Sequence, residues 1–191
     1  MALLALGLIL FLGIHSVSIV APAWRNAQVT RRGEHAWKGV YSLVSLAGLV
    51  LLIYGYGAAR QSTPLLYAPP QLLRQFSLLL MLPVFPLLFA AYMPGRIQRG
   101  ARHPFLLAVL LWATAHLLSN GTLADVLLFG AFLVWTVADL ISVQRRAVPH
   151  KVPGAPPAAF NDVVAIVGGL LVYVGFLLWA HRWMTGVSLL A

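Results

Sequence analysis

The sequence predicts an all-α integral membrane protein: a bundle of about six transmembrane helices forming one domain over residues 1–191. Of its residues, 61% are hydrophobic and only 9% are charged. The apolar runs are roughly 20 residues long, enough to cross the ~30 Å hydrocarbon core of a bilayer. A membrane β-barrel would instead need segments of about ten residues that alternate between apolar and polar. These runs are continuously apolar, so we expect helices.

Six apolar segments account for nearly the whole chain, and short connections join them. We expect the third segment to kink, because Pro83 and Pro86 lie near its middle and each removes a backbone donor. Only Asn120 and Gly121 join the fourth and fifth, so these two helices should be antiparallel neighbours. We expect Gly121 to supply a left-handed helix end there, and Asp162 to cap the last helix. The predicted spans are 2–21, 39–58, 72–93, 104–119, 122–143 and 162–183.

The positively charged residues are concentrated in alternate connections between the predicted spans. The formal net charge is +9, but ten of the 13 Lys and Arg lie in or next to the first, third and fifth connections. The positive-inside rule then puts these connections in the cytoplasm and both termini outside. We therefore interpret the basicity as a sign of membrane topology and expect no binding to nucleic acid. The ten residues are Arg25, Arg31, Arg32, Lys38, Arg96, Arg99, Arg102, Arg145, Arg146 and Lys151.

Aromatic residues fit the same topology. Eight of them fall near the ends of predicted spans, where amphipathic rings anchor helices at the membrane surface. We interpret all eight as anchors: Trp24, Trp37, Tyr41, Tyr54, Tyr56, Tyr92, Trp179 and Trp183. In the last span, the small residues Ala165, Gly168, Gly169 and Gly175 predict close approach to a neighbouring helix.

Polar groups at membrane depth are few, and two histidines stand out among them. His15 lies inside the first span and His116 inside the fourth. An ionisable side chain within a span is costly and is by default a functional candidate. Among the acids, Glu34 lies in a predicted loop and Asp125 starts a helix as a cap. Only Asp139 lies within a span, and we expect it to pair with Arg145 or a histidine.

The spacing around these histidines predicts room for a cofactor. Trp112, His116 and Asn120 recur at i, i+4 and i+8, so they share one helical stripe. Gly7 lies eight residues before His15 and leaves space on the same face. Two neutral imidazoles from separate helices, in a chain without cysteine, suit the axial ligation of haem iron better than a zinc site.

The depths of the histidines leave the pairing open. At ~1.5 Å per residue, His15 lies roughly 9 Å from the cytoplasmic end of its helix and His116 roughly 18 Å from the same side. His103, at the entrance of the fourth span, is by depth an equally good partner for His15. The metal ligands that we predict are His15 and His116, and the wider candidate set for cofactor binding is His15, His116, His103, Trp112, Asn120 and Arg102.

Three stretches together resemble the NnrU family of bacterial membrane proteins, which is similar to plastid zeta-carotene isomerase. The resemblance covers nearly the whole chain. It implies a multi-pass protein of the bacterial inner membrane, with His15 and His116 ligating haem b. It also implies a role in denitrification and nitric oxide metabolism, or haem-dependent cis-trans isomerisation of a polyene. The stretches are GIHS at 13–16, RRGEHAWKGVYSLVSL at 31–46 and RHPFLLAVLLWATAHLLSNG at 102–121.

Two other classes of function remain open. The RHP element at 102–104 also resembles membrane methyltransferases that use S-adenosylmethionine, but those need a downstream pair of acids, and this chain has no adjacent acids. The second alternative is a non-enzymatic assembly factor, whose histidines cross-link helices and whose membrane-protein partners the sequence does not name. Arg31, Arg32 and Glu34 could contact such a partner.

Overall fold

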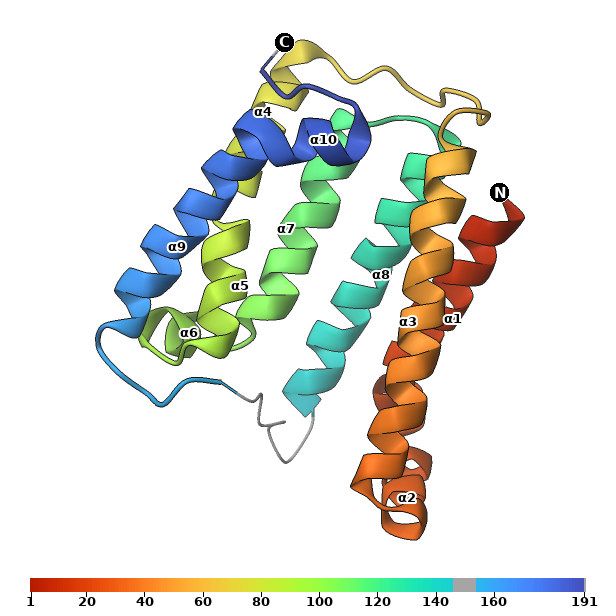
Figure 1. The fold of residues 1–191 in the computed structure, drawn as a ribbon, viewed down its shortest axis with the longest axis vertical. Helices are drawn as coiled ribbons and strands as arrows, with labels where there is room; N and C mark the ends of the chain where they lie inside the picture. The colour runs from red at the N-terminus through yellow and green to blue at the C-terminus, as the bar shows by residue number, and fades with distance from the viewer. Residues whose placement is uncertain (146–153, 191) are drawn as a thin grey trace. The chain divides into compact units, whose positions relative to one another are not determined.

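A computed structural model of the chain contains helices and no β-strand among the residues that it describes, which are 1–145 and 154–190 (Figure 1). The helices cluster into two compact units, each of which is described by itself below. The first comprises Met1–Pro69 with Ser119–Arg146, and the second comprises Pro70–Leu118 with Ala147–Ala191. The cations Arg146 and Lys151, which entered the topology prediction, lie outside the described residues.

The first unit is built from four helices. The long helices α1 and α3 pack along each other, and α8 packs on α1 (Figure 1). Their bounds are α1 (Ala2–Val20), α2 (Pro22–Arg32), α3 (Glu34–Ala59) and α8 (Leu123–Arg145).

Glycines set the distance between α1 and α3. A Cβ on Gly7 would lie 2.6 Å from the backbone nitrogen of Leu52, and one on Gly48 would lie 2.6 Å from that of Phe11. Small residues of this kind let helices approach closely in a membrane. The prediction that Gly7 leaves space beside His15 is therefore wrong, because the backbone of α3 fills that space.

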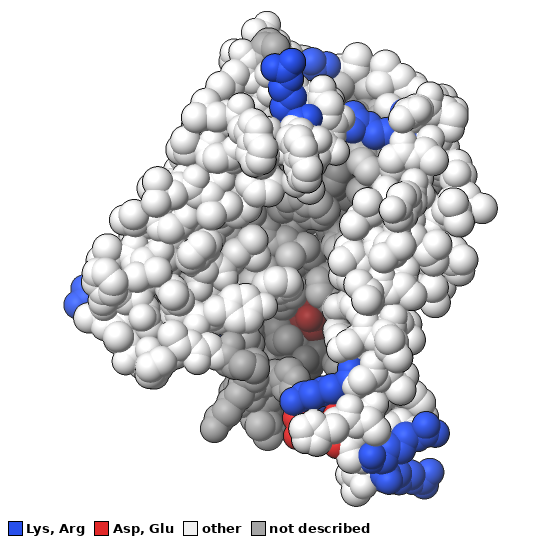
Figure 2. Space-filling view, in the orientation of Figure 1, with Lys and Arg blue, Asp and Glu red and all other residues white. Residues whose placement is uncertain are grey.

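The first connection is also more ordered than predicted. Residues 22–32 form helix α2, with Pro22 at its first turn, where a missing N–H is tolerated. Glu34 is not in a loop but begins α3, and its carboxylate lies 2.8 Å from Lys38 Nζ one turn later. The rings of Trp24 and Trp37 meet edge to face at 5.8 Å. Figure 2 shows the cations of this end of the unit gathered over α2.

A buried carboxylate joins α3 to the start of α8. Asp125 is only 4% exposed and accepts hydrogen bonds from the Tyr56 hydroxyl at 2.6 Å and from the Thr122 amide and hydroxyl at 2.9 and 2.7 Å. Asp125 therefore caps its helix as predicted, and it also holds Tyr56, which we had interpreted as an anchor. Gly121 has no left-handed conformation. It is required for another reason, since a Cβ there would clash with the Tyr67 carbonyl.

The second unit contains the broken span that the prolines predict. Its first helix stops at Met81 and a new one begins at Val84, so the break falls at Leu82 and Pro83. Tyr173 donates a hydrogen bond to the Leu78 carbonyl just before the break, at 3.0 Å. The helices are α4 (Gln71–Met81), α5 (Val84–Tyr92), α6 (Arg96–Ala101), α7 (Pro104–Ser119), α9 (Asn161–Gly175), the π-helical turn η1 (Phe176–Ala180) and α10 (His181–Thr185).

Close packing of α9 on α5 confirms part of the small-residue prediction. A Cβ on Gly169 would run into the backbone of Pro86, and Ala165 is fully buried. Gly175, in contrast, has nothing within 4 Å of its Cβ position. Asp162 does not cap its own helix. Its carboxylate accepts from the amides of Arg96 and Ile97 at 2.9 and 3.0 Å and so caps α6.

Among the described residues, five helices are long and apolar enough to cross a membrane, and one further apolar helix, Pro104–Ser119, is shorter. The five are Ala2–Val20, Glu34–Ala59, Gln71–Tyr92, Leu123–Arg145 and Asn161–Thr185. Helix α7, the predicted fourth span, is apolar but has 16 residues, or roughly 24 Å at 1.5 Å per residue. Only 11–22% of the residues in the five spans are buried by the protein, and their exposed surface is mostly apolar. This composition suits helices that face lipid.

Candidate functional site

His15 lies on α1 in the first unit, half-buried in a cluster of aromatic rings. Its Nδ1 lies 2.6 Å from the Phe11 carbonyl one turn earlier. A carbonyl can only accept, so Nδ1 carries the proton and Nε2 carries the lone pair. The ring centroid is 4.4 Å from that of Phe11, 5.1 Å from Tyr41 on α3 and 6.0 Å from Trp135 on α8. Three helices therefore fix the position of this imidazole.

The sequence did not single out two members of this cluster. Tyr41 contacts the His15 ring and is thus more than a membrane anchor, and Trp135 meets it edge to face, with an interplanar angle of 89°. Asp139 lies one turn beyond Trp135 on α8. The expected pairing of Asp139 with Arg145 or a histidine stays a prediction. The sequence feature that could have pointed to Trp135 is its i, i+4 spacing from Asp139 on α8.

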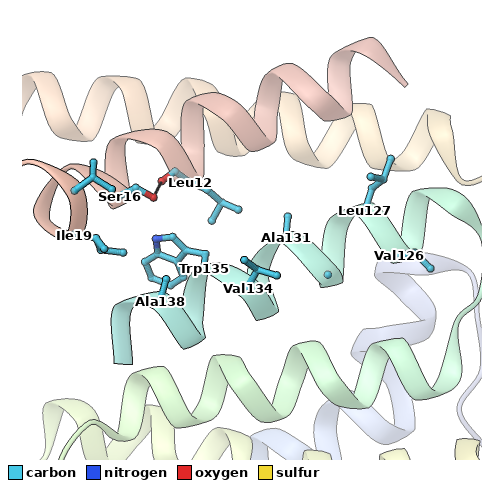
Figure 3. A pocket seen from close by; sticks show the side chains of 11 residues that line it. Leu12, Ser16, Ile19, Val126, Leu127, Ala131, Val134, Trp135 and Ala138 are labelled. Carbon is cyan, nitrogen blue, oxygen red and sulfur yellow. Dashed lines mark hydrogen bonds between the residues drawn. The ribbon is translucent and has the colours of Figure 1, made fainter. Parts of the chain in front are cut away.

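Beside this cluster, an open apolar groove of about 570 Å³ runs between α1 and α8. Figure 3 shows side chains from both helices facing the space, with the Trp135 indole at the end where Ser16 and Ile19 lie. The Ser16 hydroxyl donates to the Leu12 carbonyl at 2.7 Å. The lining residues are Leu12, Ser16, Ile19, Val20, Val126, Leu127, Gly130, Ala131, Val134, Trp135 and Ala138.

His116 lies on α7 in the second unit and repeats the arrangement of His15. Its Nδ1 lies 2.8 Å from the Trp112 carbonyl one turn earlier, and the two rings are 5.1 Å apart. The Trp112 and His116 part of the predicted stripe is therefore present. Helix α7 ends at Ser119, so Asn120 lies beyond the helix. There its amide donates to the Ser119 hydroxyl at 3.1 Å, and its carbonyl accepts from Tyr67 at 2.7 Å.

Arg102 and His103 form a strained turn just before α7. Arg102 has φ 57° and ψ −49°, and the His103 amide donates to the Ala101 carbonyl at 2.6 Å. This is a classic γ-turn, which is rare and strained for a residue with a side chain. Arg102 is exposed and His103 is half-buried. The His103 carbonyl accepts the first hydrogen bond of α7 from Leu107, which aligns the turn with the helix.

Both intramembrane histidines are thus prepared for the same chemistry. A hydrogen bond from Nδ1 to a carbonyl fixes the ring orientation and tautomer and makes Nε2 the metal-binding nitrogen, as in many metal sites. Among residues 1–145 and 154–190, no three His, Cys, Asp or Glu side chains gather into a site for a metal ion. Haem iron takes one or two protein ligands, and a neutral imidazole with its lone pair on Nε2 is the kind of ligand that it takes.

The fold and these residues define a class: a polytopic helical membrane protein with one orientated histidine in each of two units. The family model described as NnrU protein matches residues 3–189, and the chain belongs to the NnrU family. No curated protein and no solved structure matches it.

Proposed function

We propose that this NnrU-family protein binds haem b in the bacterial inner membrane, with His15 and His116 as the two axial ligands. The observation that carries the proposal is the matching arrangement of the two imidazoles. Each donates from Nδ1 to the carbonyl one turn earlier, at 2.6 and 2.8 Å. Each therefore carries its lone pair on Nε2, the nitrogen that would bind iron.

The surroundings of the two histidines support the same proposal. The rings of Phe11, Tyr41 and Trp135 pack around His15, and the ring of Trp112 lies against His116. An imidazole in such an apolar setting stays neutral, as a haem ligand must be. His103 is the alternative partner of His15.

Haem would supply a redox-active iron, which suits a role in nitric oxide metabolism during denitrification or cis-trans isomerisation of a polyene. The protein would contribute two orientated imidazoles and an apolar setting, and would need no acid-base pair. In the membrane, the basic connections would face the cytoplasm and both termini the outside.

An absorption spectrum tests the cofactor directly. The full-length protein is purified in detergent from haem-replete cells and measured as isolated and after reduction with dithionite. We expect a Soret band, with sharpened visible bands on reduction. A colourless wild-type protein that also fails to bind added haemin would contradict the proposal.

Substitutions then assign the ligands. His15→Ala and His116→Ala should each reduce haem content severalfold and shift the Soret band. His181→Ala, at a histidine in α10 near the end of the last predicted span, should leave both unchanged. A loss of haem with His103→Ala and none with His116→Ala would identify His103 as the partner of His15. Nitric oxide difference spectra and chromatography of an added cis-polyene distinguish the two roles.

A further inference from the structure

We propose that the groove between α1 and α8 is a binding site for a lipid-soluble quinone: an apolar chain that carries a neutral carbonyl-bearing ring. The proposal concerns the first unit alone and requires no haem at His15.

The size and lining of the groove favour an elongated apolar ligand. Its volume of about 570 Å³ falls within the roughly 300–1,000 Å³ typical of small-molecule sites. Nine of its eleven lining residues have aliphatic side chains or are glycine. Val134, one of the lining residues, is 71% exposed, so the groove is open along part of its length and a lipid-soluble ligand can enter it.

One end of the groove carries an unsatisfied hydrogen-bond donor. The indole Nε1 of Trp135 is buried and has no acceptor among the described residues. The only other polar side chain in the lining, Ser16, already donates its proton to the Leu12 carbonyl. Trp135 therefore supplies the donor proton for a ligand. Figure 3 shows Ile19 beside the indole, and rotation of such an aliphatic side chain takes only nanoseconds, so an oxygen can gain access to Nε1.

The charges select a neutral head group. No lining residue is charged. A fatty-acid carboxylate or a lipid phosphate placed there would find no cation among the lining residues. A quinone carbonyl accepts a hydrogen bond and brings no charge. Its flat ring also suits packing against the indole of Trp135, since aromatic pairs gain from stacked or edge-to-face contact.

The binding test uses wild-type protein in nanodiscs of neutral phosphatidylcholine, titrated with decylubiquinone. Protein-bound quinone is separated and measured by chromatography, with empty nanodiscs subtracted. We expect saturable binding of one quinone per protein. Decylbenzene, which has the chain and a ring but no carbonyl, should bind at least about fivefold more weakly, as the loss of one hydrogen bond predicts. Oleate tests the charge argument and should also bind more weakly.

Two variants and one control locate the site. Gly130 lines the groove, and a Cβ there has nothing within 4 Å, so Gly130→Phe fills the groove without disturbing the backbone and should abolish saturable binding. Trp135→Phe keeps a ring but removes the donor, and should weaken quinone binding about fivefold to tenfold while leaving decylbenzene unchanged. Gly57→Phe, at an equally open position on α3, should bind quinone as the wild type does.

Three results would overturn the proposal: no saturable quinone binding by the wild type, unchanged binding by Gly130→Phe, or equal binding of decylbenzene and quinone. The last would show that the groove holds only a hydrocarbon chain, such as that of a bilayer lipid. Because the assay measures bound quinone, it gives the same answer whether or not the protein contains haem, so a failure here and a failure of the haem proposal are distinguishable.

Discussion

Replacing Gly48 with alanine tests whether the contact between α1 and α3 holds His15 in place. The new Cβ would lie 2.6 Å from the Phe11 nitrogen and 2.9 Å from its Cα. Both are backbone atoms, so no side-chain rotation relieves the clash. The same residue, Phe11, provides the carbonyl that orientates His15.

The size of the effect follows from these distances. Ordinary carbon contacts begin near 3.4 Å, so α1 must move away from α3 by roughly 0.8 Å, which also weakens the dispersion contacts around the site. Overpacking of this kind costs about 1–3 kcal/mol. For a chain of this size, each kcal/mol corresponds to roughly 2–4 °C in Tm.

The assay is thermal unfolding of purified protein in detergent, with Gly57→Ala as the control. A Cβ on Gly57 meets nothing within 4 Å, and alanine favours a helix over glycine by roughly 0.5–1 kcal/mol, so the control should match or exceed the wild-type Tm. If Gly48→Ala and Gly57→Ala unfolded at the same temperature, the close contact between α1 and α3 would be refuted. In haem-loaded protein, only Gly48→Ala should broaden the Soret band.

Three further predictions concern other parts of the fold. Asp125→Asn should destabilise the protein by about 2–4 kcal/mol in the same unfolding assay, because an amide cannot accept from both Tyr56 and Thr122 as the buried carboxylate does; an unchanged Tm would show that these bonds contribute nothing. Arg102→Gly should raise the free energy of unfolding by up to about 1 kcal/mol, and Tm slightly with it, since glycine adopts positive φ without strain; a lowered Tm would mean that the arginine side chain holds the turn. Asp162→Asn should speed tryptic cleavage at α6, because two backbone amides lose a charged acceptor, and equal cleavage rates would remove Asp162 from that role.

Local sequence patterns were sufficient to predict the helices. Each long apolar run predicted a membrane helix, because a backbone in lipid must form its hydrogen bonds within its own segment. The break at Pro83 was predictable for the same local reason: proline has no N–H to donate. The connection at 22–32 was treated only as a link between spans and is helix α2, because the hydropathy that located the spans does not detect helices outside the membrane.

Only some of the contacts of His15 and His116 could be predicted from the sequence. Their placement on helices was predictable, and the carbonyl one turn earlier is the nearest acceptor for Nδ1. The contacts of Tyr41 and Trp135 with His15 join α3 and α8 to α1, and nothing in the local pattern specifies which helices meet.

The sequence by itself determined that this chain is a helical membrane protein with two histidines at membrane depth, because hydropathy and helical spacing are properties of short segments. The tertiary structure decided which partners these segments find. Gly7 lies against the backbone of α3 and leaves no open space. The carboxylate of Asp162 caps α6, and Trp135 lines the groove between α1 and α8. The physical reason is that each of these contacts joins residues far apart in the chain, and the packing of whole helices selects among many pairings that the sequence leaves equivalent.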